Sequence, residues 1–118
     1  GKAKHKLIWN GPPGYMSKDK VKLLLNIIAA SITALPKGGE IEVTIEGAVE
    51  RPSFVVNFRG AGARFPQHLN EFVTGKDVPA LDAMTIQAFY TNRLSKLAGM
   101  PLAIAKDGAD IRITAAAG

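Results

Sequence analysis

The stretch that decides the fold runs from Lys20 to Val43 and reads KVKLLLNIIAASITALPKGGEIEV. Its first half is almost entirely apolar, which predicts a central helix that is buried on most sides, with Ser17 as a plausible N-cap. The helix should end before Pro36, because the residue that precedes a proline is pushed out of the helical region. From residue 40 to 46, isoleucine and valine alternate with polar residues, which predicts a strand with one covered face.

The rest of the chain continues this mixture of helices and strands. Apolar alternation and turn residues mark the remaining elements: strands at 7–9 and 54–58, a short helix after Pro66, a second long helix over about Leu81–Ala98 with Gly99 as its C-terminal cap, and a hairpin of 102–104 with 111–113 around Asp107-Gly108. We therefore expect a two-layer α+β sandwich, in which helices cover one face of an open sheet and solvent covers the other.

Composition limits the function without defining it. The 118 residues are expected to form one domain, and the net charge of +5, from 15 Lys+Arg against 10 Asp+Glu, favours acidic partners. The chain has no cysteine, so disulfides, thiolate zinc sites and cysteine nucleophiles are excluded. No apolar run approaches the ~20 residues of a membrane span. We expect a cytoplasmic protein that has no membrane contact.

The apolar helix that ends in Pro-x-Gly-Gly-x-Ile-x-Val resembles the first helix and following strand of the ATP-binding domain of sensor histidine kinases. The resemblance implies the histidine-kinase ATPase-like (Bergerat-type) fold, with an about five-stranded mixed sheet and two long helices and one short helix on one face. It also implies three nucleotide contacts. These are a Mg-binding asparagine six residues before the proline, an Asp-x-Gly-x-Gly turn for adenine, and a glycine-rich turn that opens the last helix.

All three contacts are missing from this chain. The asparagine position holds Ala30, which has no oxygen ligand for a hard cation. Phe58 stands in place of the adenine-binding aspartate, although Gly60 and Gly62 of the same motif are present, and residues 85–89 read TIQAF without a glycine. We therefore expect no bound nucleotide, metal or other cofactor. The Phe58 ring would fill the volume of the adenine, although an ordinary core phenylalanine in an unrelated protein would pack in the same way.

A kinase-like framework without nucleotide contacts resembles the C-terminal domain of bacterial histidine phosphotransferases of the ChpT kind. The resemblance covers nearly the whole chain, including Leu7–Pro12 and Leu23–Asn26. It implies a non-ATP-binding domain of a two-component phosphorelay that docks response-regulator receiver domains for His-Asp phosphoryl transfer, with a hybrid histidine kinase as a further partner. The phosphorylated histidine and the homodimer contact would belong to an N-terminal helical bundle that this chain does not contain.

No residue of this chain is expected to be catalytic. His5 and His68 are the only histidines, and neither has the sequence surroundings of a phosphoacceptor, so we expect both to be structural or surface residues. Asn26 lies one helical turn before the vacant metal position and is expected to be a hydrogen-bonded helix residue rather than a ligand.

A basic partner surface is expected at Arg59, Arg64 and Lys76, which would lie on loops rather than in regular elements. Receiver domains present acidic residues around their phospho-accepting aspartate, so basic residues would favour the encounter. The segment 59–64 can also be read as an ordinary turn, since it lacks the third glycine of G-x-G-x-x-G. The alternative function is a basic nucleic-acid-binding module without catalytic activity, although aromatic residues are only 7% of the chain and no helix-turn-helix pattern is present.

Overall fold

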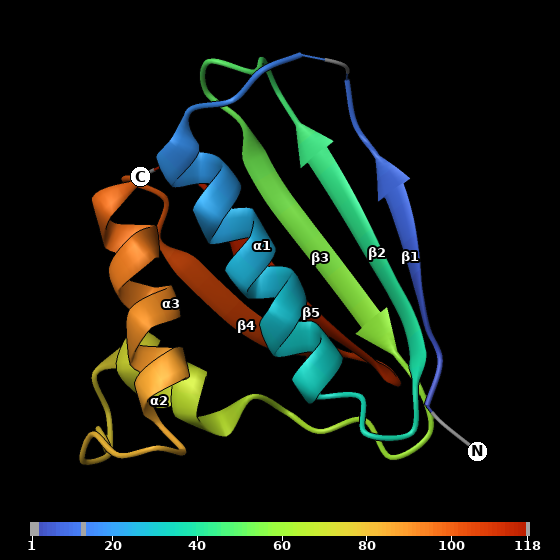
Figure 1. Ribbon diagram of the computed structural model, residues 1–118, viewed down its shortest axis with the longest axis vertical. Coiled ribbons are helices and arrows are strands. Elements are labelled where there is room, and N and C mark those ends of the chain that lie inside the picture. Colours follow the sequence, from blue (N-terminus) through green and yellow to red (C-terminus); the bar gives the residue numbers. More distant parts are fainter. Residues whose placement is uncertain (1–2, 13, 118) are drawn as a thin grey trace.

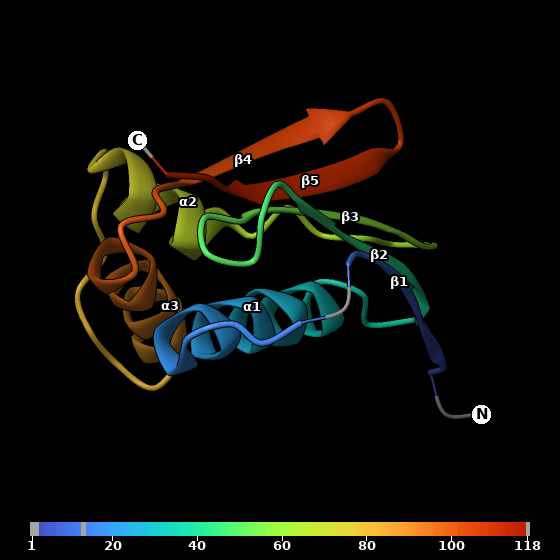
Figure 2. The same ribbon diagram turned by 90° about the horizontal axis from the view of Figure 1, so that it is seen from above.

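The computed structural model describes residues 3–12 and 14–117, and these form a sheet in one layer and helices in the other (Figure 1; Figure 2). The elements follow the order β1 (His5–Asn10), α1 (Lys18–Thr33), β2 (Gly39–Glu46), β3 (Ser53–Arg59), α2 (Gln67–Thr74), α3 (Ile86–Leu97), β4 (Leu102–Asp107) and β5 (Asp110–Ala115). The strand order is β1-β2-β3-β5-β4, with β1 parallel to β2 and every other pair antiparallel. The expected α+β sandwich with a mixed five-stranded sheet is therefore confirmed.

The core lies between the sheet and the helices, where the inward residues of the strands meet α1. Phe54, Val56 and Phe58 of β3 are fully buried and pair with β2 and β5 on either side. Side chains of this kind contribute roughly 1.5–3 kcal/mol each when they are fully buried. The alternation expected for residues 40–46 and 54–58 is confirmed, because every inward residue of these strands is buried and every outward residue is at least partly exposed.

The first helix, α1, begins after Ser17 and ends before Pro36, as expected, although the Ser17 hydroxyl makes no capping hydrogen bond. The expectation that this helix is buried on most sides is wrong. Its buried face is narrow, and Leu25 is 60% exposed and Ile32 42% exposed. The reason is that the helices form a single layer: α1 has the sheet on one side and α3 beside it, and no other helix or strand among the described residues covers its outer side (Figure 2).

The second long helix, α3, begins at Ile86, so the expected start near Leu81 is wrong. The Asp82 carboxylate accepts hydrogen bonds from the backbone N–H groups of Met84 at 2.8 Å and Thr85 at 3.0 Å, and the Thr85 hydroxyl donates to the Ala80 carbonyl at 2.7 Å. These contacts hold the chain in a turn until Thr85. The hydrogen bond from Met84 lowers the pKa of Asp82, since it favours the ionised carboxylate.

Three glycines bring two turns into direct backbone contact beyond the end of α1. Gly38 and Gly39 lead into β2, and Gly60 follows β3. A Cβ atom on Gly39 would lie 2.1 Å from the Arg59 carbonyl oxygen, and one on Gly60 would lie 2.3 Å from the Gly38 carbonyl oxygen. Gly39 also has a φ of 148°, which side chains disfavour. We call Gly38, Gly39 and Gly60 the glycine junction.

Candidate functional site

A groove of about 460 Å³ opens between α1, the segment that joins β3 to α2, and the start of α3. Alanines form much of its wall on both helices, and larger apolar side chains come from the connecting segment and from the turn before α3. The lining residues are Ala29, Ala30, Thr33, Ala34, Arg64, Phe65, Pro66, Gln67, His68, Leu69, Met84, Gln87, Ala88 and Thr91. Volumes of several hundred cubic ångströms are typical of small-molecule sites.

Two of the three positions that the kinase resemblance assigns to nucleotide contacts meet at this groove. Ala30 lines it from α1, and Gln87 and Ala88, from the segment without glycine, line it from α3. Phe58 is fully buried in the core and does not line the groove. Its inward orientation is confirmed, whereas its replacement of an adenine stays a prediction. The groove itself could not be found from the sequence, because alanines carry no signal for a cavity.

One hydrogen bond between side chains joins α1 to α3, and further polar side chains of these helices donate to backbone carbonyls of their own helix. The Gln87 amide donates a hydrogen bond to Asn26 Oδ1 at 2.6 Å, and the Asn26 amide donates to the Lys22 carbonyl at 2.8 Å. The Thr91 hydroxyl donates to the Gln87 carbonyl at 2.9 Å. Asn26 is therefore a hydrogen-bonded helix residue, as expected, and it also connects the two helices.

Arg64 supplies the positive charge of the groove. Its backbone N–H donates to the Ala34 carbonyl at 2.8 Å, which fixes the connecting segment against the end of α1. Within residues 3–12 and 14–117, no hydrogen bond or ion pair holds the Arg64 guanidinium, and no carboxylate lines the groove. His68 lies at the same groove, but its Nδ1 is 3.0 Å from Glu71 Oε1 and is engaged there.

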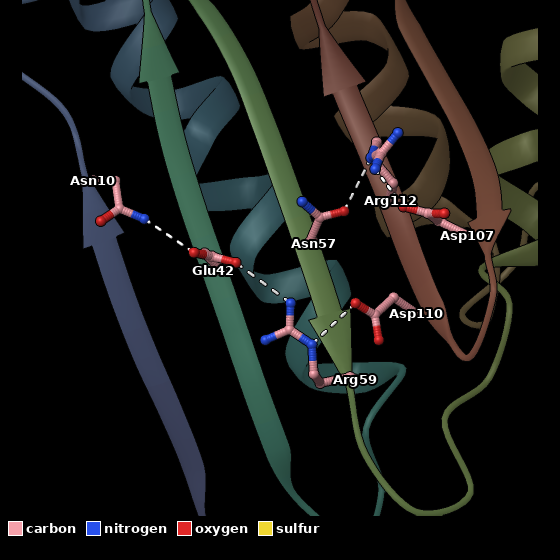
Figure 3. Close-up of polar contacts among 7 residues, drawn as sticks. All are labelled: Asn10, Glu42, Asn57, Arg59, Asp107, Asp110 and Arg112. Atoms are coloured by element: carbon pink, nitrogen blue, oxygen red, sulfur yellow. Dashed lines mark hydrogen bonds and ion pairs between the residues drawn. The ribbon is translucent and has the colours of Figure 1, made fainter.

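Arg59 lies elsewhere, so the expectation that it sits on a loop is wrong. It is the last residue of β3, and its side chain extends over the solvated face of the sheet (Figure 3). Its Nε is 3.1 Å from Asp110 Oδ2, and a second nitrogen is 3.4 Å from Glu42 Oε1. Asp110 and Glu42 both raise the pKa of Arg59, with the Asp110 hydrogen bond as the largest cause. Two acidic neighbours therefore offset its charge.

The contacts of Arg59 form one of two separate polar clusters on this face of the sheet (Figure 3). Asn10 of β1 donates to Glu42 at 3.2 Å, and Arg112 of β5 donates to Asn57 of β3 at 3.0 Å and pairs with Asp107 of β4. Every strand contributes at least one residue. Because positive and negative groups alternate, this face is not a basic patch.

The remaining candidate residues lie apart from the groove or have structural contacts. His5 is in β1, and its Nε2 lies 2.9 Å from the Leu35 carbonyl oxygen. Lys76 is exposed in the turn after α2. In the part of the chain that the structure describes, no group of three or more potential metal ligands occurs, and no helix is long and apolar enough to cross a membrane.

The family model for the histidine phosphotransferase C-terminal domain matches residues 1–110. The chain belongs to this family. It is 34% identical to the protein phosphotransferase ChpT of Brucella abortus (strain 2308) over 95% of this chain and 54% of that protein. A solved structure of a bacterial phosphotransferase shares 34% identity with a TM-score of 0.86, over 95% of this chain and 55% of the other. The chain thus spans about half the length of these relatives.

Catalytic regions of histidine kinases share the fold at much lower identity. The catalytic domain of histidine kinase ThkA superposes with a TM-score of 0.64 at 12% identity, over 93% of this chain and 75% of that one. The mycobacterial sensor histidine kinase MprB gives a TM-score of 0.61 at 17% identity, over 94% of this chain and 80% of that one. The expected histidine-kinase-like fold is therefore confirmed.

Proposed function

We propose that this domain is the non-ATP-binding C-terminal part of a phosphorelay protein and docks receiver domains beside a phosphohistidine carried by a preceding segment. The observation that carries the proposal is the groove: residues at two former nucleotide positions line it, and they offer neither a metal ligand nor a glycine-rich phosphate turn. The family match supports the phosphotransferase context.

The docking surface in this proposal lies on the helical side, at the segments that flank α2. Arg64 precedes α2 and Lys76 follows it, and both side chains are exposed. Recognition residues commonly lie on loops that a rigid scaffold positions. Arg59 is a separate candidate contact and not part of this surface, because Glu42 and Asp110 hold its guanidinium on the opposite face of the sheet.

The proposal is tested by phosphotransfer from the full-length protein that carries this domain to its receiver. Arg64→Glu combined with Lys76→Glu should slow transfer severalfold at low salt, and added salt should reduce the difference, because the charges act mainly on the encounter. Arg51→Glu, in the exposed turn between β2 and β3, is the matched control and should transfer at the wild-type rate.

Equal rates for the double variant and the wild type at low salt would remove these residues from the interface. Salt-sensitive, tight binding of the domain to duplex DNA would instead favour the nucleic-acid-binding alternative. The free energy of unfolding should barely differ between the variants, since exposed charges contribute little to stability.

A further inference from the structure

We propose that the groove between α1 and α3 binds a small amphiphilic anion, consisting of one apolar ring system or short alkyl chain with a single carboxylate, sulfonate or phosphate group. This inference goes beyond receiver docking, since it concerns a small-molecule site on the isolated domain. It rests on the shape of the groove, the apolar character of its walls and the charge at one position.

The walls favour an apolar ligand body. Ala30 and Ala88 face the groove from the two helices, and Phe65 and Leu69 add larger apolar surface from the connecting segment and α2. Removing apolar surface from water stabilises a bound state. Met84 also lines the groove and is 82% exposed, so its flexible thioether side chain can close over a ligand.

The charge arrangement favours one anionic group rather than several. Arg64 is the one arginine or lysine among the lining residues, and its guanidinium can donate two parallel hydrogen bonds to a carboxylate or phosphate. His68 is engaged with Glu71, and Gln87 with Asn26. A nucleoside triphosphate with its metal would carry several charges that no lining residue could balance. A ligand with one anionic head group matches the site.

The test begins with a pair of dyes that share an aromatic body. Anilinonaphthalenesulfonate carries one sulfonate, and phenylnaphthylamine carries no charge. We expect the sulfonate dye to bind saturably to the domain and to shift the methyl resonances of Met84, Ala30 and Ala88 in NMR spectra. Arg64→Ala should weaken the binding of the sulfonate dye about fivefold while leaving the neutral dye unchanged, because one charge-assisted contact at an exposed site is lost.

Blocking variants test the position of the site. Ala29 lines the groove from an exposed helix position, so Ala29→Leu should fold normally and weaken both dyes. Ala105→Leu, at an exposed position of β4, is the matched control and should bind both dyes as the wild type does. Near-UV circular dichroism checks that each variant retains its tertiary packing, since such dyes also bind partly unfolded proteins.

Competition with octanoate and with octyl phosphate then identifies the preferred head group. The compound that displaces the sulfonate dye shows whether the groove accepts a carboxylate or a phosphate. Failure of both to displace it would overturn the inference. Equal dye affinity in wild type, Arg64→Ala and Ala29→Leu would also overturn it, as would NMR shifts centred on the exposed apolar residues Leu7, Trp9 and Leu25. None of these outcomes affects receiver docking, which is measured by phosphotransfer.

Discussion

The glycine junction and the groove both contain positions of motifs that resemble nucleotide-binding motifs, yet the two regions match different parts of them. The junction contains Gly38, Gly39 and Gly60. The absence of a Cβ on Gly39 and Gly60 lets two backbone turns touch, and its absence on Gly38 leaves room for the backbone of Lys4. The groove has Ala30 where the resemblance places a metal ligand, and no glycine at residues 85–89. The difference indicates that the fold needs the glycines at the backbone contact, whereas it does not need the side chains that would bind a nucleotide or metal.

The largest expected effect comes from adding a methyl group at the glycine junction. Gly39→Ala and Gly60→Ala should each lower the free energy of unfolding by about 4 kcal/mol or prevent folding, because the new Cβ would overlap a carbonyl oxygen. Chemical denaturation gives the value. Gly75→Ala is the control for the conformational cost: like Gly39, Gly75 has a positive φ, of 73°, but it has open space around it, so only the backbone strain of roughly 1 kcal/mol should appear.

Similar losses of unfolding free energy for Gly39→Ala, Gly60→Ala and the control Gly75→Ala would contradict the backbone contact at the glycine junction. They would mean that backbone conformation alone, rather than the contact between the turns, explains why these glycines are required.

The next largest effect is expected in the core, on the inner face of β3. Phe58→Asp should lower the free energy of unfolding by about 3 kcal/mol or more, because it buries an unpaired carboxylate and leaves the volume of the ring unfilled. Phe58→Leu retains an apolar side chain and should cost less. Urea denaturation of both variants measures the difference. A loss below about 1 kcal/mol for Phe58→Asp would contradict its full burial on the inner face of β3.

A smaller effect is expected at the turn that opens α3, beside the groove. The folded-state pKa of Asp82 is lowered, so its stabilising contribution is present above the unfolded-state pKa of about 4 and is lost as the pH falls through the folded-state value. Amide hydrogen exchange at Met84 and Thr85 should accelerate relative to the helix centre under acid conditions. Asp82→Ala should show weak protection at every pH, and unchanged protection in that variant would contradict the role of the carboxylate.

The sequence predicts the sheet well because each inward strand position repeats every second residue and the turns carry glycine or proline. It fails at two helices for physical reasons. The apolar residues Leu25 and Ile32 of α1 suggest full burial, but burial depends on how many elements surround a helix, which its own periodicity does not record. The start of α3 depends on side-chain contacts of Asp82 and Thr85 that compete with helical hydrogen bonds.

The candidate site is predicted only in part. Counting from Pro36 locates Ala30, and the glycine-free segment locates Ala88, so the sequence identifies two positions that meet at the groove. It places Arg59 on a loop, whereas Arg59 ends β3, and the sequence does not reveal its salt bridges to Glu42 and Asp110 because these residues are distant in the chain. The cavity itself depends on the packing of three elements, and no local pattern encodes its volume.

Calorimetric titration of the domain with ATP and excess Mg²⁺ tests the central claim most directly, because the claim is that the kinase-like fold persists without nucleotide contacts. We predict no saturable heat at millimolar nucleotide for the wild type or for Ala30→Asn, since one restored amide does not replace the missing glycine turn and the aspartate position occupied by Phe58. NMR shifts recorded in parallel locate any contact. A dissociation constant in the micromolar range, with shifts centred on Ala30, Phe58 and residues 85–89, would contradict the account.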